Sequence, residues 1–284
     1  MRLVVHGGAG SIPEDPDERQ EALSAAAAAG REHDDPVDAV VAAVCDLEGN
    51  PRFNAGVGSA VQSDGTIRTD AGLMTGDRAV GAACSMAGVE HAVDVARLVC
   101  EETPHVLLAG APAVDLAADF GISTDVDLWT ERTRERWRSL APPAGSPRDH
   151  LAWVRDRFGG TDTVGAVATD GDGVAAATST GGRWCALAGR VGDVPQVGSG
   201  FYAAPAGGAS ATGAGEDIAR VTLSRVAVEY LEDGHDPESA ASEAIAYFAD
   251  RTDGEAGVVV ADRHGAVGTA HNAAAMQTAV ADDA

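Results

Sequence analysis

The sequence predicts an α+β fold in which antiparallel sheets lie between layers of helices. Short apolar runs separated by glycine-rich turns are typical of strands and hairpins, and they occur in both halves of the chain. Few segments alternate strictly as strand, helix and strand, which disfavours a doubly wound parallel sheet. The 284 residues are 45% hydrophobic, so the chain is long and apolar enough to bury a core.

The predicted strands are short apolar segments bounded by turn residues. The first ends in a glycine loop, His-Gly-Gly-Ala-Gly, at 6–10. Asp-Gly-Asp-Gly at 170–173 and Asp-Arg-His-Gly at 262–265 each join two strands into a hairpin. In chain order the predicted strands cover 2–6, a hairpin within 54–70, 80–86, 163–169, 174–178, 257–261 and 266–271.

Helices are predicted where a proline or acidic residues precede a segment with helical periodicity. Pro16 and Pro36 stand at the start of two such segments, and Gly30 is expected to end the first. The predicted helices cover 16–29, 36–47, 89–101, 111–120, 216–231 and 237–251.

The composition changes between 125 and 160. Arginine and glutamate crowd together at 132–138, and the run Ala-Pro-Pro-Ala-Gly-Ser-Pro follows at 141–147. Such a segment is typical of solvated, irregular chain, and we expect a flexible linker over about 140–162.

The charge excludes two classes of partner. There are 20 basic and 44 acidic residues, a formal net charge of -24, and every basic residue is arginine. Nucleic acid and anionic membranes are both unfavourable partners for such a surface, because their phosphates would be repelled. Acidity spread along the chain without lysine resembles the proteins of halophiles that keep concentrated salt inside the cell.

The cysteines indicate a reducing compartment. Cys45, Cys84, Cys100 and Cys185 form no CxxC pair, which argues against a zinc or thioredoxin-type motif. The apolar run after Met1 is too short for a signal peptide, and no stretch approaches membrane-spanning length. We therefore expect a soluble protein of the cytoplasm with free thiols.

Several glycine-containing motifs carry a resemblance to a known family. The loop at 6–10 lacks the spacing of a phosphate loop, and the chain has no lysine for one. Instead, the chain contains an ordered set of six motifs: His-Gly-Gly-Ala-Gly (6–10), Asn-Ala-Gly-Val-Gly-Ser (54–59), Asp-Thr-Val-Gly (162–165), Thr-Ser-Thr-Gly-Gly (178–182), Gly-Arg-Val-Gly-Asp (189–193) and Ala-Thr-Gly-Ala-Gly-Glu (211–216). Together these motifs resemble those of the isoaspartyl peptidase/L-asparaginase family, the plant-type asparaginases. These are threonine N-terminal-nucleophile hydrolases.

The resemblance implies a four-layer αββα sandwich as one domain over 1–284. It also implies self-cleavage between Asp162 and Thr163 into an α subunit (1–162) and a β subunit (163–284), and a homodimer of αβ units. A cut there suits the chemistry, because a threonine hydroxyl needs a nearby base. The freed α-amine of Thr163 has an ordinary pKa of about 7.7–8.0 and lies on the same residue as the hydroxyl.

The family's roles transfer to matching positions of this chain. Thr163 resembles the nucleophile, Thr180 the residue that hydrogen-bonds it, and Asn54 a support for this region. Arg190 resembles the group that grips the substrate's α-carboxylate, for which a planar guanidinium is suited, and Asp193 the partner of its α-ammonium. Thr212 and the N–H of Gly213 resemble the oxyanion hole.

The family implies no required cofactor, but it often holds a sodium ion on main-chain carbonyls. The matching loop implies that the ligands are the main chains of Leu47, Glu48, Asn50, Phe53, Ala55 and Val57.

The expected reaction is hydrolysis of L-asparagine, of β-aspartyl dipeptides, or of both, through a β-aspartyl ester on Thr163. Asp162 stands where the family's asparaginases usually carry glycine and resembles glycosylasparaginase, so an amidase of sugar-linked asparagine is the alternative enzyme. An unprocessed, catalytically silent scaffold is the alternative of another class.

The acidic surface predicts a dependence on salt. Because about 0.1 M salt leaves a screening length of about 10 Å, self-repulsion of the carboxylates should lower the melting temperature there relative to molar KCl. Thermal unfolding followed by circular dichroism over a KCl series checks this. A melting temperature that does not change with salt would contradict it.

Overall fold

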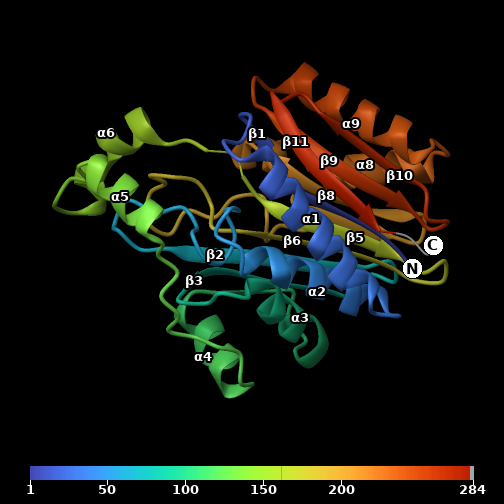
Figure 1. The fold of residues 1–284 in the computed structure, drawn as a ribbon, viewed down its shortest axis with the longest axis horizontal. Coiled ribbons are helices and arrows are strands. Elements are labelled where there is room, and N and C mark those ends of the chain that lie inside the picture. The colour runs from blue at the N-terminus through green and yellow to red at the C-terminus, as the bar shows by residue number, and fades with distance from the viewer. Residues whose placement is uncertain (161, 282–284) are drawn as a thin grey trace.

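The computed structural model describes residues 1–160 and 162–281, and its strands form two sheets (Figure 1). The strands are β1 (Arg2–Gly10), β2 (Arg68–Thr75), β3 (Val80–Ala87), β4 (Leu107–Ala109), β5 (Val164–Thr169), β6 (Val174–Thr180), β7 (Phe201–Ala204), β8 (Gly207–Gly213), β9 (Ala256–Asp262), β10 (Val267–His271) and β11 (Ala275–Ala281). The larger sheet has the order β11-β1-β5-β6-β2-β3-β4 and the smaller has β10-β9-β8-β7. Neighbouring strands are antiparallel except β3 and β4.

Helices cover both sheets. They are α1 (Pro16–Arg31), α2 (Pro36–Glu48), α3 (Ala92–Glu102), α4 (Ala111–Asp119), α5 (Glu131–Ser139), α6 (Pro147–Arg157), α7 (Gly215–Val221), α8 (Leu223–Glu232) and α9 (Pro237–Arg251). Helices α1, α2 and α3 contact the larger sheet, α8 and α9 contact the smaller, and the two sheets contact each other between these helices (Figure 1). Over the described ranges, no helix combines the length and apolar character that crossing a membrane requires.

The two-residue period of a strand divides its side chains between two cores. In β1, Leu3 and Val5 pack with the helices of the larger sheet, whereas Val4 packs between the sheets. In β5, Ala166 and Val167 divide in the same way. The mixed α/β character and the paired strands 163–169 and 174–178 are thus confirmed, with antiparallel pairing of β5 and β6.

Several predicted boundaries are wrong for identifiable reasons. Gly30 does not end the first helix, which continues to Arg31. A Cβ at this position would come within 2.5 Å of Leu3 and 2.6 Å of the Ala39 carbonyl oxygen, so close packing accounts for the glycine. The predicted helix 216–231 is broken at Thr222, whose φ is 53°. The break lets Ser224 and Arg225 donate their backbone N–H groups to the loop at 198–199.

Other predictions erred on the regularity of the chain. The expected hairpin within 54–70 is a loop with one isolated bridge, Val61 to Ile67, ahead of β2. The predicted irregular linker carries α6, which is capped by Ser146 and Asp149. Residue 161 of that linker and residues 282–284 of the proposed β subunit lie outside the described residues. Strand β8 was missed because its glycine, alanine and serine content is not typical of strands.

Gly72 sets the distance between the sheets where β2 meets β7. A Cβ on Gly72 would overlap the ring of Phe201, which is fully buried. Gly72→Ala should therefore lower the free energy of unfolding by about 1–3 kcal/mol through overpacking. Denaturant unfolding checks this, with Gly49→Ala as the matched control because its Cβ would meet nothing closer than 3.7 Å. Equal stability of the two variants would contradict the packing argument.

Candidate active site

Two threonines meet at one end of the space between the sheets. The register pairs Val164 of β5 with Ser179 of β6, so continuing it by one residue sets Thr163 opposite Thr180. The Thr163 hydroxyl donates a hydrogen bond to Thr180 Oγ1 at 3.2 Å, and both residues are buried. The backbone N–H of Gly182 donates to the same Oγ1 at 3.1 Å. The hydroxyl of Thr180 is thus held at a fixed place beside that of Thr163.

Asn54 holds the carbonyl that precedes Thr163. Its side-chain amide donates to the main-chain oxygens of Asp162, at 2.7 Å, and of Gly182, at 2.6 Å. Its own Oδ1 accepts from the Ala60 N–H at 2.8 Å, which fixes the orientation of the amide. Asn54, the predicted supporting residue, therefore contacts the peptide bond between Asp162 and Thr163, which is the predicted cleavage junction.

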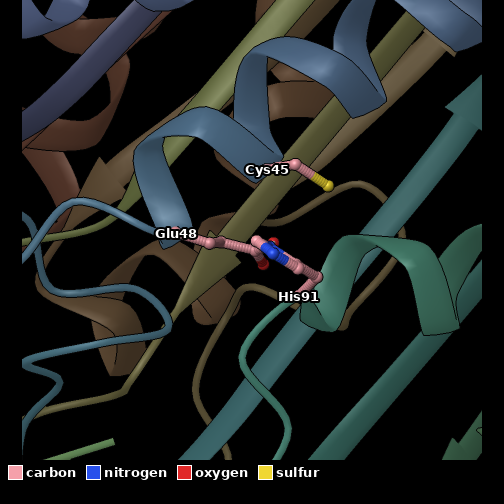
Figure 2. A group of neighbouring side chains, drawn as sticks. All are labelled: Cys45, Glu48 and His91. Atoms are coloured by element: carbon pink, nitrogen blue, oxygen red, sulfur yellow. The ribbon is translucent and has the colours of Figure 1, made fainter. Parts of the chain in front are cut away.

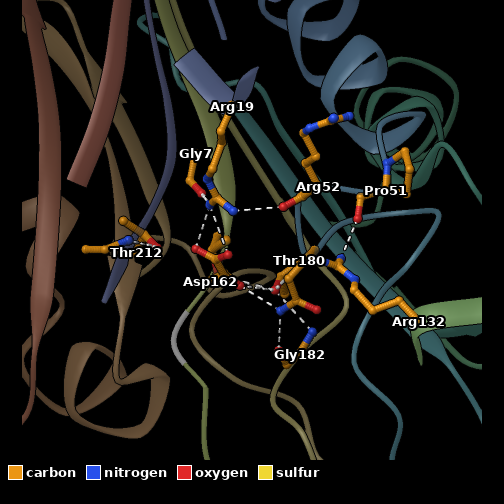
Figure 3. Close-up of polar contacts among 12 residues, drawn as sticks. Gly7, Arg19, Pro51, Arg52, Arg132, Asp162, Thr180, Gly182 and Thr212 are labelled. Atoms are coloured by element: carbon orange, nitrogen blue, oxygen red, sulfur yellow. Dashed lines mark hydrogen bonds and ion pairs between the residues drawn. The ribbon is translucent and has the colours of Figure 1, made fainter. Parts of the chain in front are cut away.

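The Asp162 side chain is anchored by Arg19, a residue to which the sequence assigned no role. One guanidinium nitrogen of Arg19 lies 2.9 Å from each carboxylate oxygen of Asp162 and also donates to the Gly7 carbonyl, and another donates to the Arg52 carbonyl at 2.8 Å (Figure 3). Gly8, with φ of 113°, approaches so closely that a Cβ would collide with the Asp162 carboxylate. The glycine loop after β1 therefore leaves room for the Asp162 side chain.

Arg190 and Asp193 lie together, and within the described residues a buried polar atom of each has no hydrogen bond. Nε of Arg190 donates to Glu216 at 2.7 Å, but its Nη2 and Oδ2 of Asp193 find no hydrogen-bond partner in the described chain. A Cβ on Gly215 would lie 2.5 Å from Asp193 and 2.8 Å from Arg190, so this glycine makes space between them. One free cationic atom and one free anionic atom suit a ligand that carries both charges, such as an amino acid.

Burial changes the acidity of the carboxyls in this region. It raises the pKa of Asp193 to about 6, although the Arg190 guanidinium opposes the shift. It likewise raises the pKa of Asp70 to about 7, and Arg190 opposes that shift too. The pKa of Glu216, in contrast, is below its ordinary value. Burial opposes this decrease, but the guanidinium groups of Arg190 and Arg183 outweigh it. Glu216 belongs to the motif at 211–216, but the electrostatic roles of Glu216 and Asp70 depend on contacts that the sequence does not show.

A second buried polar group lies between the sheets behind Thr163. His6 Nε2 is 2.8 Å from the hydroxyl of Ser210, which is 2.7 Å from that of Thr178. Burial lowers the pKa of His6 to about 3, so the imidazole is neutral. A Cβ on Gly165 would collide with Ser210 and come within 2.5 Å of His6. This network was missed because its members are up to 204 residues apart in the sequence.

Thr212 and Gly213 end β8 just before α7. The Thr212 hydroxyl accepts the Ala9 N–H at 3.3 Å and therefore faces β1 across the space between the sheets. Gly213 has a φ of 140°, and a Cβ there would collide with the Glu255 carbonyl.

A hollow of about 660 Å³ opens beside the junction. Asn54, Asp162 and Gly182 line it together with Arg19 and Trp184. Thr163 is not among the lining residues and is 5% exposed. In the intact chain, Asp162 therefore lines the hollow, whereas the buried Thr163 does not.

In the predicted sodium loop, backbone N–H groups donate hydrogen bonds to carbonyl oxygens of the same loop. The Val57 N–H donates to the Glu48 carbonyl at 2.9 Å, which brings the two ends of the set together. Asn50 accepts from the Phe53 N–H at 3.1 Å. A carbonyl oxygen has two lone pairs, so these bonds leave one for a cation.

Comparisons with known proteins agree with the motifs. The family model described as Asparaginase matches residues 1–284. The chain is 41% identical over 273 residues to "Isoaspartyl peptidase/L-asparaginase" of Danio rerio, covering 93% of this chain and 86% of that protein. It is 41% identical over 285 residues to "Plant-type L-asparaginase" of Pyrobaculum calidifontis, covering 96% and 94%. It is 39% identical over 274 residues to "Isoaspartyl peptidase/L-asparaginase" of Homo sapiens, covering 93% and 87%. With the resemblance confirmed by these matches, the chain belongs to the asparaginase family.

Proposed function

We propose that the chain is a self-processing amidohydrolase that acts on L-asparagine and β-aspartyl dipeptides, with Thr163 as its nucleophile. The proposal rests on the hydrogen bonds at the junction between Asp162 and Thr163. Asn54 donates to the Asp162 carbonyl, and the Thr163 hydroxyl donates to Thr180. Its fold is proposed to be the four-layer αββα sandwich of N-terminal-nucleophile hydrolases, as one domain. The names of the relatives support both substrate classes.

The first reaction is the cut itself. Oγ1 of Thr163 attacks the carbonyl carbon of Asp162, the bond to the Thr163 nitrogen breaks, and the hydroxyl proton passes to that nitrogen. The resulting ester is hydrolysed by water, which leaves a carboxylate on Asp162 and a free amine on Thr163. The amide of Asn54 stabilises the negative charge that develops on the Asp162 oxygen, because it already donates to that atom.

The second reaction uses the new amine. The freed α-amine accepts the proton of the Thr163 hydroxyl. The hydroxyl oxygen then attacks the side-chain carbonyl carbon of the substrate. Ammonia or an amino acid leaves, and water hydrolyses the β-aspartyl ester. Arg190 and Asp193 would bind the substrate's α-carboxylate and α-ammonium with their free atoms. Thr212 and the N–H of Gly213 would form the oxyanion hole.

Further properties follow as parts of this proposal. No cofactor is required, a structural Na⁺ would be held by the carbonyls of the loop described above, and the processed subunits would form a homodimer of αβ units. The four free cysteines of the described chain support a reducing cytoplasm. The net charge of -24 supports a halophilic protein that binds neither nucleic acid nor membrane.

Asp162 favours one second candidate, an amidase for asparagine linked to N-acetylglucosamine. A panel of L-asparagine, β-aspartyl-leucine and glycosylated asparagine, assayed in molar KCl, separates the two. We expect turnover of the first two. Turnover of the glycosylated substrate alone would support the second candidate.

Thr163→Ala should abolish both reactions. We expect uncut chain by intact mass, and a kcat reduced more than about 10³-fold, because the nucleophile is lost. Thr169→Ser, at the end of the strand that follows Thr163, is the matched control and should be cut and active. N-terminal sequencing of wild-type enzyme should yield a second sequence that begins Thr-Val-Gly.

Two results would overturn the assignment. One is cleavage of Thr163→Ala at the same bond. The other is an active wild-type preparation that contains a single full-length chain, and an inactive preparation of that kind would instead support the silent scaffold.

The raised pKa of Asp193 predicts how substrate binding depends on pH. Below about pH 6 its carboxyl becomes protonated and loses its attraction for an α-ammonium, so the KM of wild-type enzyme should rise as the pH falls through that value. Asp193→Asn should have a high KM that stays flat over the same range. Steady-state kinetics from pH 5 to 8, an interval of about 3 units around the shifted value, check this. A variant whose KM still follows the wild-type profile would contradict the role.

A further inference from the structure

Three side chains that can bind metal gather at the end of α2, where the predicted sodium loop, whose ligands are main-chain carbonyls, begins. Cys45, Glu48 and His91 each offer one atom, and these atoms all lie within 4.8 Å of one another (Figure 2). Cys45 and Glu48 are three residues apart on a helix and so share one face. His91 immediately precedes α3. The cluster therefore joins the end of one helix to the start of the next.

The buried carboxylate is only partly satisfied. Glu48 is fully buried, and its Oε1 accepts from the Val93 N–H at 3.1 Å and from the Ser179 hydroxyl. Its Oε2 has no hydrogen bond in the described chain and faces His91 Nδ1 at 3.5 Å (Figure 2). His91 Nδ1 is also buried without a hydrogen bond there. The two atoms form an ion pair when His91 is protonated, and when the imidazole is neutral the same nitrogen and the carboxylate oxygen can both act as metal ligands.

The third atom completes a recognisable ligand set. The Cys45 thiol lies 3.7 Å from an Asp94 carboxylate oxygen. Burial first, and then the carboxylates of Glu48 and Asp94, raise the pKa of this thiol. A hollow of about 440 Å³, lined by Cys45 and His91 among others, connects the cluster to solvent. A cation could therefore enter and would meet an electronegative environment.

We propose that Cys45 Sγ, Glu48 Oε2 and His91 Nδ1 bind a zinc-type divalent transition metal ion, with water from the hollow in the fourth position. Thiolate, imidazole and carboxylate are zinc ligands at about 2.0–2.3 Å, and neighbouring ligands of a tetrahedral ion lie about 3.3–3.8 Å apart. The 3.5 Å between Glu48 and His91 already matches this spacing. Binding replaces the thiol proton with the metal and releases that proton to solvent.

The site would brace the fold and does not depend on the proposed hydrolase activity. It would link the end of α2 to the start of α3, and through the bond from Ser179 to Glu48 it would also reach β6 next to Thr180. Its expected effect is therefore on stability, whether or not the chain cuts itself.

Zinc and cobalt binding test the proposal on the full-length protein after dialysis against EDTA. Calorimetry should show one Zn²⁺ bound per chain, and Zn²⁺ should raise the melting temperature. Co²⁺ should produce a thiolate-to-metal charge-transfer band in the near ultraviolet. Cys45→Ser should lose that band, and both Cys45→Ser and His91→Gln should weaken Zn²⁺ binding more than about tenfold.

Cys100→Ser and His105→Gln are the matched controls, because each removes a potential ligand outside the cluster; both should bind Zn²⁺ as the wild type does. Circular dichroism without metal identifies any variant that fails to fold. The proposal is overturned if the wild type binds no Zn²⁺, if folded Cys45→Ser keeps the band, or if the control variants lose binding to the same extent.

Discussion

The two-residue period of β5 and β6, together with their register, determines where the chemistry of this protein lies. Because Val164 pairs with Ser179, Thr163 and Thr180 fall opposite each other on the side that faces the second sheet. Ser179 points the other way, toward α2, where it contacts Glu48. A slip of one residue would exchange the two faces and separate the threonines, so the pairing of one hairpin positions the whole site.

The charged groups around that hairpin have separate tasks. Arg19 forms an ion pair with Asp162 at the junction. Arg190 pairs with Glu216, and its Nη2 has no hydrogen bond to any described residue. Asn54 contacts the junction carbonyl without adding charge. The intact chain therefore holds its cleavage junction and its proposed substrate anchors at the same time. Asp162 lines the neighbouring hollow, whereas Thr163 is buried and does not line it.

Sequence patterns predicted those elements whose formation depends on residues close together in the chain. The hairpins at 164–180 and 256–271 and the helix Pro237–Arg251 follow from alternation, turn residues and a proline start. The motifs named Asn54, Thr163 and Thr180, which the structure brings together, while their catalytic roles stay predictions. Arg19 and His6 could not be predicted, because their partners are 143 and 204 residues away and only the tertiary fold brings them together. The break at Thr222 likewise depends on the loop to which α8 docks.

The junction at Asp162 has a consequence for chemical labelling. All 20 basic side chains are arginine, so no side chain of this sequence carries a primary amine. Cleavage at Asp162 would create an α-amine on Thr163, and this nitrogen would be the proposed general base. Reductive methylation with isotope-labelled formaldehyde would then place an NMR-visible methyl group on that nitrogen and leave every side-chain cation unmodified. The protonation of the catalytic amine could thus be followed directly as the buffer is titrated.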